Sequence, residues 1–189
     1  MASAFGHAAA AIALASALRT GRPPRRYWLL AIGCAVAPDL DVLGFGLGIP
    51  YGSLLGHRGL SHSLAAAAVI AALALLLVPR ALWPERRARL WLAFALATAS
   101  HGLLDAMTDG GLGVAFFSPV DATRHVLPWR PILVSPVDPE AFFSDRGLAI
   151  LRSEATWIGL ASLALLVLSE GSRAVLRRRR DRAVPAAPA

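Results

Sequence analysis

Three short stretches of this sequence concentrate side chains that can bind a metal ion. They are APDLD (37–41), HRGLSHS (57–63) and SHGLLDAMTDGG (100–111). Each holds histidine or aspartate, and each adjoins a long apolar run. Imidazole and carboxylate groups together suit zinc, manganese or iron, and a mixed cluster of this size has room for two ions. These residue types therefore predict a metal centre.

The spacing within the stretches predicts how the side chains are presented. His101 and Asp105 are four residues apart in an expected helix, so they share one face and suit a common metal ion. Asp39 and Asp41 are two apart and cannot share a helical face. Pro38 and the glycines after it predict a broken, extended stretch in which both carboxylates reach inward. Ser61 is placed to cap the next helix, with His62 in its first turn.

The expected roles follow from residue type. The expected ligands of one or two divalent ions are His7, Asp39, His57, His62, His101 and Asp105. Zinc is expected first, with manganese or iron as alternatives. His7 has the weakest case, because a lone histidine at a membrane edge is more often an interfacial polar residue. Arg58 offers a cationic fork for phosphate or a developing oxyanion, and Asp41 or Asp109 is expected to act as general base or to orient a ligand.

Other polar residues have simpler interpretations. Ser61 and Ser63 are expected to cap a helix or to hydrogen-bond to the ligands, and not to be nucleophiles, because no G-x-S-x-G motif surrounds them. His125 lacks a partner at ligand spacing and is expected to be a loop residue. The acids Asp121, Asp138 and Asp145 are expected to be solvated.

Five apolar segments must position these residues: about 5–19, 26–38, 62–79, 88–108 and 153–172. The chain of 189 residues is 56% hydrophobic and 16% charged, which favours a membrane protein. A soluble helical bundle remains the alternative, because each segment is short for a span. The segments are apolar nearly all round, and Tyr27, Trp28, Trp83 and Trp91 lie beside arginine-rich connections. The expected fold is therefore all-α, a polytopic membrane bundle of about five helices.

Charge predicts the topology. The chain has no lysine, and most of its arginines lie in three regions: between the first and second segments, between the third and fourth, and after the fifth. The positive-inside rule makes these regions cytoplasmic and places the N-terminus outside. All the metal-binding stretches then converge on the outer face, although the inverted topology stays open. Arginines shared among short loops make nucleic acid an unlikely partner, and membrane lipids are the expected one.

The ends of the chain add little chemistry. The first twenty residues are rich in alanine but lack the basic start of a signal peptide, so we expect them to form the first helix. Residues 1–176 are expected to be one membrane-embedded domain, and 177–189 a basic flexible tail. With one cysteine, Cys34, no intrachain disulfide and no cysteine-rich zinc site is expected.

The order PDLD, HRGLSHS, SHGLLDAMTDGG, with an early histidine and a later FFSP (116–119), resembles the YdjM family of bacterial inner-membrane, metal-dependent hydrolases. The resemblance covers His7 to about Trp157. It implies metal or catalytic roles for Asp39, Asp41, His57, His62, His101 and Asp105, with Arg58 and Thr108 in support. Ser61 stands where the family commonly has threonine, which keeps the hydroxyl. More distantly, the family is similar to the all-helical zinc phospholipase C and single-strand nuclease superfamily, which implies phosphoester hydrolysis.

The leading hypothesis is thus an inner-membrane metal-dependent hydrolase acting on a phosphoester of a lipid or lipid-linked molecule. The rival is a non-enzymatic membrane protein, either a metal-binding transporter component or a scaffold with a structural ion. A transporter is expected to carry polar residues in mid-span, and the third and fifth segments have almost none. An intramembrane metalloprotease is disfavoured because no H-E-x-x-H occurs.

Overall fold

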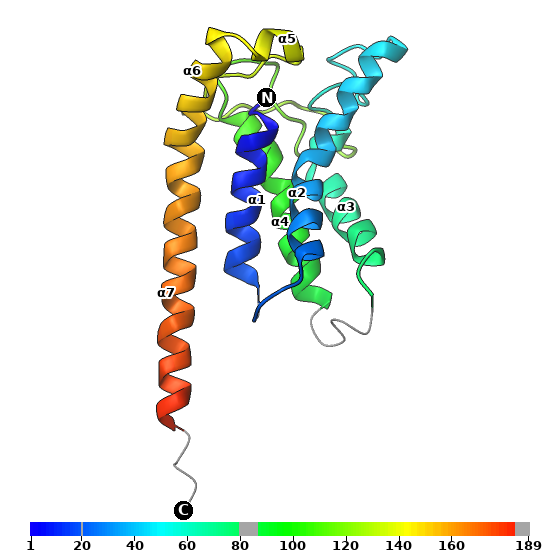
Figure 1. Cartoon of the computed structure of the whole chain (residues 1–189). Coiled ribbons are helices and arrows are strands. Elements are labelled where there is room, and N and C mark those ends of the chain that lie inside the picture. Colours follow the sequence, from blue (N-terminus) through cyan, green and yellow to red (C-terminus); the bar gives the residue numbers. More distant parts are fainter. Residues whose placement is uncertain (20, 80–86, 184–189) are drawn as a thin grey trace, which may run out of the picture.

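The computed structural model describes residues 1–19, 21–79 and 87–183, and within these ranges it contains helices and no strand (Figure 1). Three helices pack around a fourth to form a bundle, and a further long helix stands alongside one of the three. The elements are α1 (Ala4–Leu18), α2 (Arg25–Val36), the 3₁₀ segment η1 (Ala37–Leu47), the 3₁₀ turn η2 (Leu60–His62), α3 (Leu64–Leu76), α4 (Arg87–Ala106), α5 (Pro139–Phe142), α6 (Asp145–Glu154), the π turn η4 (Ala155–Gly159) and α7 (Leu160–Ala183).

Alanine makes up most of the bundle core. Helix α4 packs against α1, α2 and α3, and the buried cluster between them includes Ala15, Ala31, Ala71 and Ala93 around Phe94. Small side chains let helix backbones approach closely, which is how membrane helices gain packing contacts without a hydrophobic driving force. The bundle therefore holds α4, with its histidine and aspartate, at its centre.

The expected five-span bundle is not confirmed. Within the described ranges, two continuous helical segments are long and apolar enough to cross a membrane, Arg25–Leu47 with 23 residues and Asp145–Arg179 with 35. Helices α1 and α3 are apolar but shorter. The first four expected segments do correspond to α1 to α4, while the fifth is much longer than 153–172 because α6, η4 and α7 run on without a break.

The stretch that holds Asp39 and Asp41 is helical, and the expectation of an extended backbone there is wrong. Helix α2 passes directly into η1, which continues in 3₁₀ form to Leu47. Pro38 falls in the first turn of η1, where its missing N–H costs nothing. Gly48 ends the segment in the left-handed conformation, with φ of 75°, which glycine adopts without strain.

The cap of α3 also differs from expectation. Ser63, not Ser61, caps this helix, and its hydroxyl accepts a hydrogen bond from the Ala66 N–H at 3.0 Å. His62 consequently lies in η2, just before α3, instead of in its first turn. Ser61 is left to contact the site described below.

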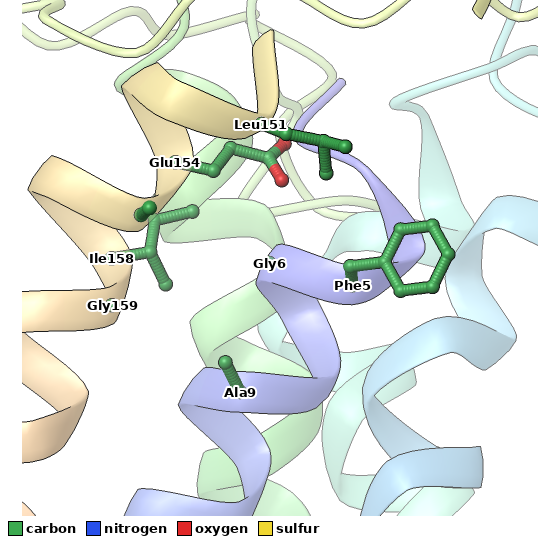
Figure 2. Close-up of a pocket in the computed structure, with 8 residues that line it drawn as sticks. Phe5, Gly6, Ala9, Leu151, Glu154, Ile158 and Gly159 are labelled. Carbon is green, nitrogen blue, oxygen red and sulfur yellow. The ribbon is translucent and has the colours of Figure 1, made fainter. Parts of the chain in front are cut away.

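The upper end of α1 is held against α6 and η4. Glu154 is buried, and its carboxylate accepts hydrogen bonds from the N–H and the hydroxyl of Ser3, the N-cap of α1. Gly6 lets the helices approach, since a Cβ there would lie 2.9 Å from Ile158. A mainly apolar pocket of about 190 Å³ lies beside this contact, and Figure 2 shows the residues that line it, with Ile158 directed toward α1.

The opposite end of the molecule carries arginines. Arg173 of α7 donates to the Ser16 carbonyl at 2.7 Å, and Arg19 pairs with Glu170. Tyr27, expected in an interfacial belt, is instead buried, and its hydroxyl donates to the Ala15 carbonyl. Arg177 to Ala183, expected to begin a flexible tail, lie within α7. The expected loop residues Arg80, Trp83 and Arg86 lie outside the described residues, as do 184–189.

Candidate metal centre

Four side chains from three elements point toward one another at the upper end of α4. Asp39 comes from η1, His62 from η2, and His101 and Asp105 from α4. Each offers one ligand atom, and these four atoms all lie within 4.8 Å of one another. Gly102 lets η2 approach α4, because a Cβ at this position would lie 2.9 Å from the His62 carbonyl oxygen. The helical spacing of His101 and Asp105 thus places two ligands directly against the other two.

The distances among the four atoms suit a single ion. The two Nε2 atoms of His62 and His101 are 3.0 Å apart. Asp39 Oδ1 lies 3.6 Å from the first and 3.3 Å from the second, and Asp105 Oδ2 lies 3.5 and 3.8 Å from them. Tetrahedral zinc with bonds of about 2.0–2.2 Å separates its ligand atoms by roughly 3.3–3.6 Å. The four side chains are therefore arranged as the ligands of one such ion would be.

Two of the four inward atoms lack a hydrogen-bond partner. Asp39 Oδ1 and Asp105 Oδ2 are buried and have no hydrogen-bond partner within the described part of the chain. Buried polar atoms without partners cost free energy, and native proteins contain few of them. The two facing imidazole nitrogens repel each other unless a cation or a proton lies between them. A divalent cation satisfies all four atoms at once, so the donor set fits a metal ion.

Contacts outside the group fix both histidine rings. His101 Nδ1 lies 2.7 Å from the Ala35 carbonyl oxygen, and His62 Nδ1 lies 3.2 Å from Asp41 Oδ2. Histidines that bind metals commonly donate their second ring N–H to a carbonyl or carboxylate, which selects the tautomer and orients the ring. Both rings are therefore held with Nε2 directed inward.

A second group, formed by Asp41, His57 and His62, has the distances of a hydrogen-bond network. His57 Nδ1 lies 2.7 Å from Asp41 Oδ1, a normal hydrogen-bond length and shorter than the separation of two ligands on one ion. The hydroxyl of Ser61 and the backbone N–H of Arg58 donate to Asp41 Oδ2. The network surrounds His62 on the side away from the four-atom group, and His57 stands at its outer end.

Arg58 is directed into the interior, which differs from the expectation that it meets phosphate. Its side chain is fully buried, and Nε lies 3.2 Å from Asp105 Oδ2. The two Nη atoms donate to the Thr108 hydroxyl at 3.0 Å and the Gly110 carbonyl at 2.9 Å. Arg58 has a φ of 62°, unusual for a residue with a side chain. In this arrangement the guanidinium holds Asp105 and the loop after α4.

The charges around the centre balance when a divalent cation is added. Asp39, Asp41 and Asp105 bring three negative charges, and Arg58 brings one positive charge into the same buried region. A buried region with an excess of two negative charges is strongly disfavoured, because charges removed from water require compensation. A single divalent ion brings the total to zero when the histidines are neutral.

Arg124 supports the loop that carries His57, and no sequence motif identified it. Its guanidinium donates to four carbonyl oxygens, those of His57, Gly113, Tyr51 and Ser53, at 3.0 to 3.3 Å. It also lies over the Tyr51 ring, 5.6 Å from the centroid. Burial lowers the pKa of Arg124 and raises the pKa of the Tyr51 hydroxyl. All four acceptors are backbone atoms, so their residue types gave no signal.

Of the expected histidines and carboxylates, His7 and Asp109 belong to neither group of ligand atoms, while Asp41 and His57 lie in the hydrogen-bond network. His7 of α1 is fully buried and stacks on His101 with ring centroids 3.7 Å apart, while its Nε2 lies 3.5 Å from Asp105 Oδ1. It covers the centre but belongs to neither group of ligand atoms. Asp109 is exposed, and its carboxylate accepts a hydrogen bond from the Val134 N–H at 2.7 Å. The geometry therefore ties Asp109 to a loop and keeps His7 beside the centre.

The remaining loop residues lie away from the cluster. His125 pairs with Val114 in an isolated antiparallel bridge. Asp121, Asp138 and Asp145 are exposed. None of these four belongs to a group of ligand atoms among the described residues.

Comparison with known proteins adds a family. A family model described as YdjM inner membrane protein matches residues 1–177. The curated inner membrane protein YbcI of Escherichia coli strain K12 is 33% identical over 166 residues, which covers 88% of this chain and 95% of that protein. No solved structure matches the chain significantly.

Proposed function

Because this chain belongs to the YdjM family of inner membrane proteins, we propose that it is a membrane-embedded, metal-dependent hydrolase. The observation that supports this proposal is the convergence of four ligand atoms in a largely apolar bundle, two of which, Asp39 Oδ1 and Asp105 Oδ2, have no hydrogen-bond partner among the described residues. Ionisable groups at membrane depth are costly and are usually functional. The proposed location is multi-pass in the inner membrane, with the centre toward the extracytoplasmic side.

The proposed ligands are Asp39, His62, His101 and Asp105, with zinc as the first candidate ion. Such an ion would supply a nucleophile at neutral pH and polarise a phosphoryl oxygen. Asp41 orients His62 through Nδ1, and Arg58 holds Asp105 at Oδ2. His57 and Ser61 keep Asp41 in place through its two oxygens. Of the two roles expected for Asp41, general base or orienter of a ligand, these contacts support the second.

The proposed substrate is a phosphoester of a lipid or lipid-linked molecule. The phosphoester bond is proposed from the resemblance to the zinc phospholipase C superfamily. The lipid character of the substrate is proposed from the embedding of the protein in a membrane. The exposure of Asp39 supports access of a substrate to the centre, because its side chain is 12% exposed while those of the other three ligands are fully buried. A molecule that reaches the centre would meet Asp39 first.

The rival proposal is a non-enzymatic membrane metal protein, and one observation favours it. Four protein ligands complete a tetrahedral zinc ion, and structural zinc sites are closed in this way. A catalytic ion keeps an open position or accepts a fifth ligand. Metal content with no hydrolysis would therefore support a structural or transport role.

Elemental analysis of the detergent-purified protein, followed by phosphodiesterase and phosphomonoesterase assays, tests the proposal. The wild type is compared with a His62→Ala, His101→Ala double variant and with His125→Ala, which removes a histidine outside the cluster. We expect stoichiometric metal and activity in the wild type and in His125→Ala, and loss of both in the double variant. Equal metal content in all three proteins, or none in any, would rule out this centre.

A further inference from the structure

Among the described residues, the most exposed side chains of the centre lie on η1. Of the side chains in the two ligand groups, His57, His62, His101 and Asp105 are at most 1% exposed. Asp39 and Asp41, both on η1, are 12% and 6% exposed. The side of η1 is therefore the one from which a molecule reaches the ligands through the least covering protein.

The exposed surface of η1 is apolar. Leu40 is 65% exposed, Leu43 69% and Leu47 82%, and the following loop adds Leu54 and Leu55. No charged residue occurs between Asp41 and His57. Figure 1 shows this segment projecting from α2 away from the bundle. Exposed apolar groups of this extent mark a contact with another apolar phase or molecule.

The length of α2 places η1 near a membrane boundary. Helix α2 has 12 residues and η1 has 11. At the rise of α and 3₁₀ helices, Asp39 and Asp41 lie roughly 25 Å along the axis from Arg25. The hydrocarbon layer is about 30 Å thick. With Arg25 at one boundary, the two carboxylates and Leu40 lie just inside the other boundary, Leu43 lies about at it, and Leu47 lies roughly 8 Å beyond it among the headgroups.

We propose that η1 lies in the bilayer leaflet on the side of the metal centre and that the substrate is a membrane lipid entering laterally past this segment. The bilayer, and not a protein partner, is the occupant that the continuous apolar segment Arg25–Leu47 favours, because this segment has the length and composition of a span. The proposal of a lipid substrate rests on the proposed hydrolase function. The proposed depth of η1 in the bilayer is independent of that function.

Spin-label accessibility in vesicles of phosphatidylcholine and phosphatidylglycerol measures that depth. A nitroxide is attached to a single cysteine at Leu43→Cys in a Cys34→Ala background, and its collisions with oxygen and with a neutral, water-soluble nickel chelate are compared. Val167→Cys in α7, 62% exposed, gives the lipid reference. Val120→Cys, 95% exposed in a loop at the opposite end from the arginines, gives the aqueous reference.

We expect the Leu43 label to collide with oxygen and to meet nickel less often than the Val120 label does, between the two references. Nickel collisions equal to those at Val120 would place η1 in water and overturn the inference. Shielding from both reagents would indicate a protein contact, such as a second copy of the chain, and would overturn it too. Nickel collisions at Val167 itself would instead contradict the membrane embedding in the proposed function.

A substrate comparison tests lateral entry separately. A Leu43→Asp, Leu47→Asp variant makes η1 polar without altering a ligand. We expect it to retain its metal and its hydrolysis of a soluble nitrophenyl phosphodiester, and to lose hydrolysis of phospholipid in vesicles. Equal loss on both substrates, or on neither, would contradict entry past η1.

Discussion

Asp105 is the residue on which most contacts of the centre converge. It faces His62 and His101 with one oxygen and accepts the Ala2 N–H at 2.7 Å with the other, while Arg58 lies beside it. Asp109, four residues later, is exposed and bonds only to a loop. The two carboxylates are therefore a matched pair for testing which acids hold the ion.

Replacing Asp105 by Asn should abolish metal binding, because the amide supplies no charge to the ion and still fills the space. Asp109→Asn should retain full metal content, since an amide oxygen can accept from Val134 as the carboxylate does. Elemental analysis of the two variants decides between them. Loss of metal in Asp109→Asn would contradict this assignment and show that Asp109 is needed to bind the ion.

Arg58→Met should destabilise the protein by about 3–5 kcal/mol, the usual cost of breaking a buried ion pair from one side. The substitution removes the guanidinium from beside Asp105 and the donor to the Thr108 hydroxyl, and the Gly110 carbonyl keeps only its hydrogen bond from Thr108. Thermal unfolding in detergent measures the change, with Arg130→Met as the control for loss of an exposed arginine. A similar melting temperature for both variants would mean that the buried contacts of Arg58 do not stabilise the protein.

Removal of the ion should lower stability by about 3 kcal/mol relative to protein with free ion at about 100 times the dissociation constant. Chelator titration followed by thermal unfolding measures this difference. The His62→Ala, His101→Ala variant provides the control, because its melting temperature should not respond to chelator. A response of equal size in that variant would locate the bound ion elsewhere.

At this scale, the sequence identified residue types better than contacts. Histidines and aspartates next to apolar segments are costly, so their gathering could be predicted from composition and order alone. The inward turn of Arg58 could not, because its acceptors at Thr108 and Gly110 lie about fifty residues away and one of them is a backbone carbonyl. The roles of the gathered residues remain predictions.

Among the elements, the loop after α4 depends on glycine. Gly111 has a φ of 91°, and a Cβ there would overlap with Nη1 of Arg58. Gly111→Ala should therefore cost about 1–3 kcal/mol from backbone strain alone and weaken metal binding by moving Arg58. Gly52→Ala is the matched control, since nothing lies within 4 Å of its added Cβ. Equal melting temperatures and metal content in the two variants would contradict this role.

Element boundaries show where sequence reasoning succeeds and fails. Continuous apolar runs ending at proline, glycine or arginine located α1 to α4 within a few residues. The same kind of signal gave a wrong prediction at Pro38, where we expected the helix to break. Proline in a first helical turn is compatible with the helix that η1 continues. The choice between Ser61 and Ser63 as cap depended on tertiary contacts of Asp41, which local sequence does not contain.

For the whole molecule, the two ends differ in charge, and this difference predicts orientation. Arg19, Arg25, Arg26 and Arg173 lie at the end opposite the centre. The positive-inside rule places that end in the cytoplasm. A reporter fused after Pro79 should be active in the cytoplasm, and one fused after Gly111 should be active outside. The opposite pair of results would show the reverse orientation, with the centre on the cytoplasmic side.

The shortness of α3 has a consequence for the surrounding lipid. Its 13 residues rise about 20 Å, roughly 10 Å less than a typical hydrocarbon layer. If α3 crosses with the rest of the bundle, the bilayer beside it must become thinner, and this hydrophobic mismatch costs a fraction of a kcal/mol for each Å. Acyl-chain length then becomes a determinant of stability, and vesicles of shorter-chain phospholipids should raise the melting temperature of the protein above that in longer-chain ones.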